Sequence, residues 1–187
     1  MGKKIEFFKT FVKDRDVASV IPTSPRCVKK VCKNIDFSKD ITLVEYGPGN
    51  GAFTHYLVEN MSPGSRLILI EENQDFVSSL KESINDPRVE IHNVLAGDVE
   101  SVLDDDVVGN VDYVLSGIPF SFLNWDRKIE VLQATKKILK DDGKFLAYQT
   151  SGHLKKPVME VFGNFETDFE PLNIPPYFIY KIHKNGH

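Results

Sequence analysis

Residues 41–54, ITLVEYGPGNGAFT, decide the fold of this chain. An apolar run at 41–44 leads into three alternating glycines, Gly47, Gly49 and Gly51, and a helical pattern follows. Glycine lets the backbone turn sharply and approach a ligand with no Cβ in the way. The helix that follows points its free N–H groups at that ligand. The stretch predicts a ligand-binding strand–loop–helix unit, with an ordinary tight turn as the alternative.

Length and composition indicate one globular domain. The 187 residues, 41% hydrophobic and 27% charged, suffice for a single domain with a sizeable core. No apolar run has the length of a membrane span and no secretory signal pattern is present, so we expect a cytoplasmic protein. The two cysteines, Cys27 and Cys32, have no pair of histidines nearby. We therefore expect neither a structural disulfide nor a metal site.

The charge is unevenly distributed along the chain. Residues 1–40 hold ten Lys or Arg and five Asp or Glu, whereas residues 41–187 hold thirteen and twenty-two. This predicts a basic helical cap, 1–40, on an acidic core, 41–187. A basic segment suits an anionic partner such as a membrane surface or nucleic acid. The acidic core argues against a broad nucleic-acid-binding face.

The first helical pattern covers residues 3–13. Ile5, Phe8 and Val12 share one face, and lysines occupy much of the remaining surface. Residues 3–15 are therefore expected to contact an anionic membrane surface, at the inner face of the membrane. The same apolar face could equally pack on the domain.

Strand-like and helical segments alternate after this cap, which is typical of a parallel sheet with helices on both faces. Strands are predicted at 41–44, 66–70, 89–92, 111–115 and 144–149, and helices at 52–61, 73–84, 125–139 and 157–162. Two more strand-like runs, 165–172 and 177–182, have no helix between them and predict an antiparallel pair. The expected fold class is α/β and Rossmann-like, with a mainly parallel seven-stranded sheet, a C-terminal antiparallel hairpin and one domain over 1–187.

The glycine spacing, E-x-G-x-G-x-G from Glu45 to Gly51, resembles motif I of the class I S-adenosylmethionine (SAM) methyltransferases. In that family the acidic residue and the glycine loop hold the amino-acid end and the ribose of SAM. The resemblance implies SAM as cofactor and S-adenosylhomocysteine as product. The cofactor-binding candidates in this stretch are Glu45, Tyr46, Gly47, Pro48, Gly49, Gly51, Phe53 and Thr54.

Carboxylates also follow the next two predicted strands. Glu71 ends the second strand, where open α/β folds bond ribose hydroxyls, and the neighbouring Glu72 is the alternative. Asp98 follows the third strand and could accept a bond from the adenine amino group, with the N–H of Val99 meeting a ring nitrogen. Asp98 could instead be a helix N-cap. All these residues are expected at the carboxyl edge of the sheet, where such folds bind ligands.

The fourth strand ends in Ser116-Gly117-Ile118-Pro119-Phe120, where methyltransferases place their acceptor-facing loop. Ser116 and Gly117 are therefore candidates for both cofactor and acceptor contacts. Methyl transfer needs mainly alignment of nucleophile, methyl carbon and sulfur. Phe120 could present a π-face to a cation or simply pack in the core. An amine must be neutral to attack, so His153 or Tyr148 could accept its proton, unless His153 is an ordinary surface histidine.

The whole chain resembles the short bacterial and archaeal phospholipid N-methyltransferases. The segments that carry this resemblance are 1–24, 44–54, 116–120 and 173–180, the last reading NIPPYFIY. The resemblance implies transfer of methyl groups to the amine of phosphatidylethanolamine. An rRNA adenine dimethylase is the nearest alternative, but its N-L-P-Y loop would have asparagine where this chain has Gly117. A small-molecule amine methyltransferase and a non-catalytic SAM-binding module are further alternatives.

Overall fold

The computed structural model describes residues 23–186. The helix predicted over 3–13 and the membrane contact predicted for 3–15 lie outside the described residues. Thr23-Ser24-Pro25 begins the first helix that can be described, α2 (Pro25–Cys32), and the Ser24 side chain caps it by accepting a bond from the Cys27 N–H at 3.2 Å.

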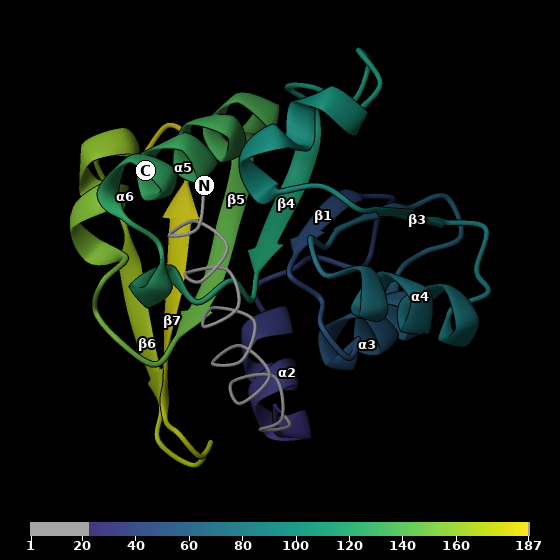
Figure 1. The fold of residues 1–187 in the computed structure, drawn as a ribbon, viewed down its shortest axis with the longest axis horizontal. Coiled ribbons are helices and arrows are strands. Elements are labelled where there is room, and N and C mark those ends of the chain that lie inside the picture. The colour runs from purple at the N-terminus through teal and green to yellow at the C-terminus, as the bar shows by residue number, and fades with distance from the viewer. Residues whose placement is uncertain (1–22, 187) are drawn as a thin grey trace, which may run out of the picture.

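Seven strands form one sheet in the order β3-β2-β1-β4-β5-β7-β6 (Figure 1). The first five strands run parallel to one another, and β7 lies antiparallel between β5 and β6. The predicted fold class is therefore confirmed, including the terminal hairpin. The strands are β1 (Thr42–Tyr46), β2 (Arg66–Ile70), β3 (Val89–His92), β4 (Val111–Ser116), β5 (Leu139–Gln149), β6 (Glu166–Glu170) and β7 (Tyr177–His183).

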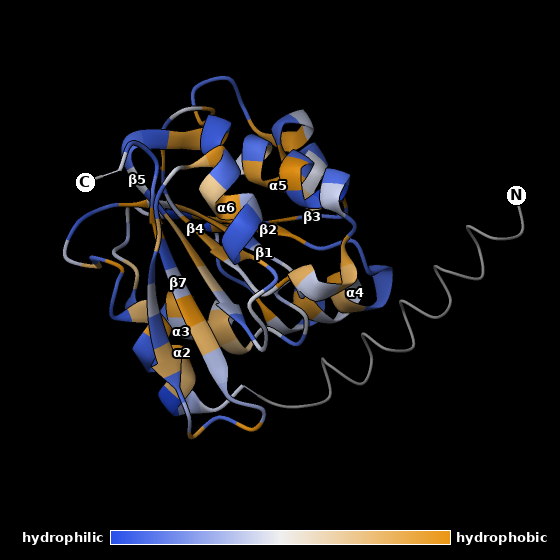
Figure 2. Ribbon diagram, turned by 90° about the vertical axis from the view of Figure 1, so that its left-hand side faces the viewer, coloured by the Kyte–Doolittle hydropathy of each residue, from blue (hydrophilic) through white to orange (hydrophobic). Residues whose placement is uncertain are grey.

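Helices cover both faces of the sheet because successive strand residues point to opposite sides. Val44 and Tyr46 of β1 enter one hydrophobic core and Leu43 enters the other. The first core includes residues of η1 (Ala96–Val102), α5 (Trp125–Ile138) and α6 (Lys155–Val161); the second includes residues of α2, α3 (Ala52–Asn60) and α4 (Gln74–Ser83). Figure 2 shows hydrophobic residues concentrated on the central strands, with hydrophilic residues over much of the outer helix surfaces.

The start of β5 differs from the prediction. The sequence predicts a helix over 125–139 and a strand from 144, but the strand begins at Leu139, directly after α5, and includes the polar residues 140–142. Lys184 explains part of this extension: its N–H donates to the Gly143 carbonyl at 3.1 Å and its Nζ donates to the Leu139 carbonyl at 2.6 Å. These bonds to the end of β7 hold the polar segment in the sheet.

The sheet brings several loops to one edge. Parallel strands β1, β2, β4 and β5 end at the same edge, and β7, being antiparallel, begins there. The glycine loop, the loop after β4 and the β6–β7 connection at 171–176 therefore share the edge at which open α/β sheets bind ligands.

Candidate active site

The glycine loop connects β1 to α3 with three residues in the left-handed region. The φ angles of Gly47, Gly49 and Gly51 are 63°, 56° and 79°, conformations that favour glycine. The loop is tied down by bonds from the Gly47 N–H to the Ile70 carbonyl and from the Gly51 N–H to the Pro48 carbonyl, both 2.9 Å. A Cβ at Gly49 would meet no heavy atom within 4 Å, so the backbone there borders open space.

Glu45 lies beneath this loop and is almost completely buried. Its Oε2 accepts a bond from the Thr54 hydroxyl of α3 at 2.8 Å. Burial raises the pKa of the Glu45 carboxyl to about 8, the Thr54 bond opposes that rise, and the charge of Glu71 adds to it. A cation bound nearby would favour the ionised carboxylate. Glu45 and Thr54, both predicted cofactor residues, thus form one buried pair.

Glu71 links the end of β2 to the glycine loop. The buried Glu71 carboxylate accepts bonds from the Gly49 N–H at 3.1 Å and from the Asn73 N–H at 2.9 Å. Glu72 is partly exposed, and its carbonyl accepts a bond from the Asn93 side chain. Glu71 is therefore the carboxylate whose contact with the glycine loop fits the predicted ribose role.

Asp98 and Val99 lie in η1, beyond the end of β3. The Asp98 side chain is exposed, whereas the Val99 side chain is fully buried in the core. Leu95, and not Asp98, occupies the N-cap position of η1, so the helix-cap alternative for Asp98 is wrong. The Asp98 carboxylate is thus accessible from outside, whereas Val99 could offer a ligand only its backbone.

The loop after β4 meets the glycine loop at Gly117. The Gly117 N–H donates to the Tyr46 carbonyl at 2.9 Å, and a Cβ at Gly117 would overlap the Tyr148 hydroxyl and lie 3.0 Å from the Gly47 carbonyl oxygen. Ser116 is fully buried, and its Oγ accepts a bond from the Ile118 N–H at 3.3 Å. The structure thus brings together three predicted residues: Gly47, Gly117 and Tyr148.

Tyr148 belongs to an aromatic cluster at this junction. Its ring stacks on Phe53 with centroids 4.5 Å apart and meets Tyr177 edge-on at 5.3 Å. Burial, reinforced by the charge of Glu45, raises the pKa of the Tyr148 phenol well above its usual value. The phenol therefore keeps its proton at neutral pH, so Tyr148 is suited to positioning and not to the predicted proton acceptance.

His153 lies apart from this cluster. It is exposed in the loop after β5, and its Nδ1 is 2.9 Å from the Ser151 hydroxyl oxygen. The structure therefore agrees with the alternative prediction of a surface histidine.

Two aromatic side chains point away from the site. Phe120 is fully buried in the first hydrophobic core, which agrees with the core-packing alternative and contradicts an aromatic wall facing the acceptor. Tyr46 enters the same core, where the Thr135 hydroxyl donates to the Tyr46 hydroxyl at 3.4 Å. Tyr46 can therefore contact a cofactor only through its backbone. For Tyr46, the alternation of β1 directs the side chain toward α5.

Gln149 is a site residue that the sequence reasoning missed. Its Oε1 accepts a bond from the Phe120 N–H at 3.0 Å, and its Nε2 donates to the Ile118 carbonyl at 2.7 Å. This buried amide fixes the acceptor-facing loop on the last residue of β5. The available signal was a glutamine directly after the mainly apolar run 145–148.

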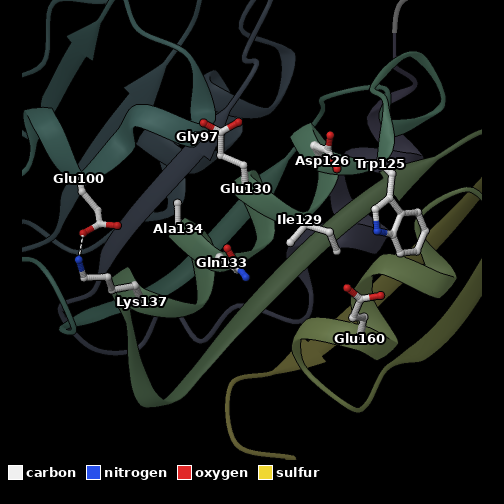
Figure 3. A pocket seen from close by; sticks show the side chains of 10 residues that line it. All are labelled: Gly97, Glu100, Trp125, Asp126, Ile129, Glu130, Gln133, Ala134, Lys137 and Glu160. Atoms are coloured by element: carbon white, nitrogen blue, oxygen red, sulfur yellow. Dashed lines mark ion pairs between the residues drawn. The ribbon is translucent and has the colours of Figure 1, made fainter.

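A hollow on the outer surface of α5 is separate from this site (Figure 3). Its lining is Gly97, Glu100, Trp125, Asp126, Ile129, Glu130, Gln133, Ala134, Lys137 and Glu160. The Glu100–Lys137 ion pair crosses one end of it. Neither the glycine loop nor the Tyr148 cluster contributes to the lining. Among residues 23–186, no three His, Cys, Asp or Glu side chains are grouped so that they could hold a metal ion.

Solved structures of SAM-dependent methyltransferases share this fold. The 1,6-didemethyltoxoflavin-N1-methyltransferase of Burkholderia thailandensis, solved with S-adenosylhomocysteine, superposes with a TM-score of 0.68 at 15% identity over 95% of this chain and 85% of its own. A SAM-dependent methyltransferase of Aquifex aeolicus gives 0.65 at 12% identity over 83% and 89%. The chain is a class I methyltransferase that uses SAM as methyl donor.

Residues 12–116 match the model of the ribosomal RNA adenine dimethylase family, and the chain belongs to that family. An ornithine lipid N-methyltransferase of Singulisphaera acidiphila is 25% identical over 170 residues, which cover 90% of this chain and 88% of the relative. The ribosomal RNA small subunit methyltransferase A of Mycoplasma capricolum is 30% identical over 97 residues, or 50% of this chain. That match spans only 34% of the Mycoplasma protein.

Within residues 23–186, no helix is both long enough and apolar enough to cross a bilayer.

Proposed function

We propose that this enzyme N-methylates the primary amine of phosphatidylethanolamine-type phospholipids. The observation that carries the proposal is the environment of Gly117. An rRNA adenine dimethylase would have asparagine here, but the Tyr148 hydroxyl and the Gly47 carbonyl fill the space that a side chain would need. The loop therefore lacks the amide expected to bond an adenine amino group and offers an aromatic surface instead.

The extent of each match supports the same acceptor. The family model matches residues 12–116 and so ends at the last residue of β4. This part contains the glycine loop and Glu71, which serve the cofactor, while the acceptor-facing loop and the β6–β7 hairpin follow it. The similarity to the ornithine lipid enzyme extends over 90% of the chain and therefore includes part of the acceptor side. Both lipids offer an amine on a headgroup.

The proposed residue roles follow from the geometry. Bound SAM would supply an electrophilic methyl group on a positively charged sulfur. The open backbone at Gly49 would admit the cofactor, Glu71 would bond its ribose hydroxyls and Glu45 would offer a carboxylate to its positive end. Gln149 holds the acceptor loop beside the glycine loop. The amine loses its proton to solvent, forms the new N–C bond as the C–S bond breaks, and is aligned beside Tyr148.

The aromatic cluster also suits a cationic product. Phe53, Tyr148 and Tyr177 gather at the junction of the two loops. A methylated ammonium group is attracted by the faces of aromatic rings, and this attraction is stronger where water is excluded. The cluster thus suits the methylated ammonium product of an alkylamine acceptor.

Family membership favours rRNA adenine as the second candidate, and a small-molecule amine is the third. The test is methyl transfer from labelled SAM to detergent-dispersed phosphatidylethanolamine, with ornithine lipid and phosphatidylcholine in parallel. Mass spectrometry should find methylated phosphatidylethanolamine and no product from phosphatidylcholine, which has no free amine. Transfer to ornithine lipid alone would move the acceptor to that lipid class. Transfer to neither, by a protein that binds SAM, would refute the proposal.

A further inference from the structure

The β6–β7 connection, residues 171–176, has its polar side chains turned inward and its apolar ones outward. Glu170 and Asn173 are each only 1% exposed, whereas Leu172 and Ile174 are 63% and 82% exposed. Phe169, at the end of β6, is also half-exposed. Isolated exposed apolar residues are common, but an alternation with the polar side chains buried is the reverse of what solvent favours.

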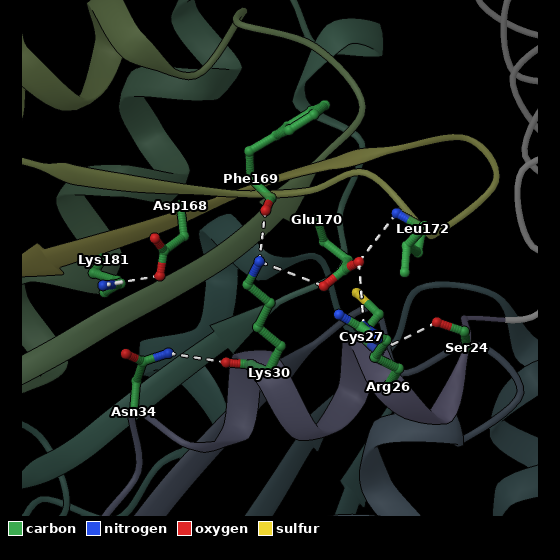
Figure 4. Close-up of polar contacts among 10 residues, drawn as sticks. All are labelled: Ser24, Arg26, Cys27, Lys30, Asn34, Asp168, Phe169, Glu170, Leu172 and Lys181. Atoms are coloured by element: carbon green, nitrogen blue, oxygen red, sulfur yellow. Dashed lines mark hydrogen bonds and ion pairs between the residues drawn. The ribbon is translucent and has the colours of Figure 1, made fainter.

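The inward side chains hold this arrangement in place. The Asn173 Oδ1 accepts a bond from the Ser24 N–H at 3.1 Å, and its Nδ2 donates to the Pro175 carbonyl at 2.9 Å. The Glu170 Oε1 accepts a bond from the Leu172 N–H at 3.0 Å (Figure 4). The Ser24 bond attaches the loop to the N-cap of α2, and the other two bonds fix the loop's own shape. Leu172 and Ile174 therefore cannot turn inward without breaking these bonds.

Positive charge flanks these apolar residues. Arg26 lies 3.7 Å from the Glu170 carboxylate, yet its side chain is 70% exposed, and Lys30 lies 3.4 Å from the same carboxylate (Figure 4). The Leu172 N–H bond, reinforced by Lys30 and Arg26, lowers the pKa of Glu170 below its usual value. The sequence of α2 contains three basic and no acidic residues. Arg26 sits in the first turn, where the helix dipole disfavours a cation, so helix stability does not explain it.

The hairpin tip projects at the edge that carries the candidate active site (Figure 1). Tyr177, which begins β7 directly after the tip, has its ring 5.3 Å from that of Tyr148. On α6, exposed Lys155 and Lys156 begin the helix at the same edge, and Lys155 Nζ is 5.8 Å from the Phe178 ring. Apolar residues thus project beside the basic residues of α2 and close to the proposed acceptor loop.

We propose that the β6–β7 tip, with Leu172 and Ile174 inserted among the lipids and Arg26 at the phosphate level, docks the enzyme on an anionic bilayer. This inference rests on the proposed lipid acceptor. Apolar side chains bordered by arginine and lysine match the layered chemistry of a membrane surface, and each added base strengthens binding to anionic lipid. The docked bilayer presents its headgroups to the Tyr148 cluster.

A fluorescent label at the tip tests this docking in the full-length chain. An environment-sensitive fluorophore is attached to Ile174→Cys. Native Cys27 and Cys32 do not compete because both are fully buried, and burial raises the pKa of the Cys27 thiol to about 11. Vesicles of phosphatidylglycerol and phosphatidylethanolamine should shift its emission to the blue, more than phosphatidylcholine vesicles do. Ser83→Cys, exposed at the far end of α4, is the matched control and should not respond.

Two results would overturn the docking proposal. One is an unchanged emission on adding anionic vesicles. The other is a blue-shifted emission before any lipid is added, which would show that the tip is covered by residues 1–22 or by a second copy of the chain.

A double variant separates docking from catalysis. Leu172→Ser with Ile174→Ser should weaken vesicle binding by roughly tenfold or more, because apolar area no longer leaves water. Transfer to detergent-dispersed phosphatidylethanolamine should stay at the wild-type rate. An equal loss in both assays would mean that the tip serves the active site and not docking. If wild type binds vesicles but methylates no dispersed lipid, the proposed function fails while docking stands.

Discussion

Gly49 allows a direct test of the predicted cofactor site. Its φ of 56° makes any side chain strained, but a Cβ there would enter open space and not the protein. Gly49→Ala should therefore lower the free energy of unfolding by only about 1–2 kcal/mol. It should weaken SAM binding far more, since the new methyl group occupies the space at the loop that the cofactor needs. Calorimetric titration with SAM and thermal unfolding measure the two effects separately.

Gly109→Ala is the matched control for this substitution. Gly109 has a φ of 83° and a Cβ there would also meet nothing within 4 Å, but it precedes β4 at the opposite edge of the sheet. The control should lose similar stability and keep its affinity for SAM. Equal SAM affinity in the Gly49 and Gly109 variants would show that the glycine loop does not form part of the SAM-binding site.

Glu45 gives a pH dependence with a defined sign. Its pKa of about 8 means that the carboxyl is mostly protonated at neutral pH without cofactor. A cationic cofactor favours the carboxylate, so binding should release a proton, and SAM affinity should rise with pH until about pH 8. Titration calorimetry in buffers of different ionisation enthalpy counts that proton. Glu45→Gln should abolish both the release and the pH dependence.

The raised pKa of Glu45 makes the stability of the cofactor-free protein fall with rising pH, whereas SAM affinity rises. The folded protein holds the Glu45 proton more tightly than the unfolded chain, so this group's contribution to stability decreases between about pH 4.5 and pH 8. The cofactor-free wild type should lose stability over that window relative to Glu45→Gln. A wild type that binds SAM without proton release would contradict the placement of Glu45 beside the cofactor.

At the scale of single residues, backbone roles could be predicted better than side-chain roles. The glycines and Glu71 follow from their spacing, because turn geometry and strand ends are local properties. Phe120 and Tyr148 do not, because their roles depend on which face of the sheet each side chain enters. Tyr148 turns toward Phe53 and the site, while Phe120 turns into the core under α5.

At the scale of elements, Gln149 connects β5 to the acceptor-facing loop. Gln149→Ala leaves the Phe120 N–H and the Ile118 carbonyl without their side-chain partner, and should cost about 1–3 kcal/mol of stability. We expect kcat to fall while SAM affinity stays near wild type, because the glycine loop is untouched. Steady-state kinetics and SAM titration separate these effects.

Two further substitutions serve as comparisons for the kinetics of Gln149→Ala. Gln149→Glu keeps an acceptor for the Phe120 N–H but loses the donor to Ile118, and should have an intermediate kcat. Gln133→Ala, exposed on the outer surface of α5, should leave kcat unchanged. A Gln149→Ala enzyme with wild-type kcat would show that the two Gln149 side-chain bonds do not position the acceptor-facing loop.

The order of elements could be predicted from the sequence, since each strand and helix is marked by a local pattern and by turn residues. The strand whose start differs most from the prediction is β5, and its early start depends on bonds from Lys184, far away along the chain. The inverted hairpin tip was also not predictable, because the burial of Asn173 depends on the Ser24 backbone. Long-range partners decide both features.

At the scale of the whole molecule, the part of the chain up to Ser116 identifies the methyl donor, and the part after it bears on the methyl acceptor. The family match ends at Ser116, so it assigns the methyl donor, while Gly117, Tyr148 and the β6–β7 tip bear on the acceptor. The predicted membrane contact of residues 3–15 stays a prediction. If it holds, it would act together with the tip in docking the enzyme on lipid.

The most direct measurement places both acceptors in one reaction. Labelled SAM is added to the full-length enzyme with detergent-dispersed phosphatidylethanolamine and a folded small-subunit rRNA fragment, and the products are separated by organic extraction. Our account predicts label in the lipid phase, as mono-, di- or trimethylated ethanolamine headgroups, with the RNA unlabelled. Label in the RNA as N6-methylated adenine, with the lipid unlabelled, would contradict it.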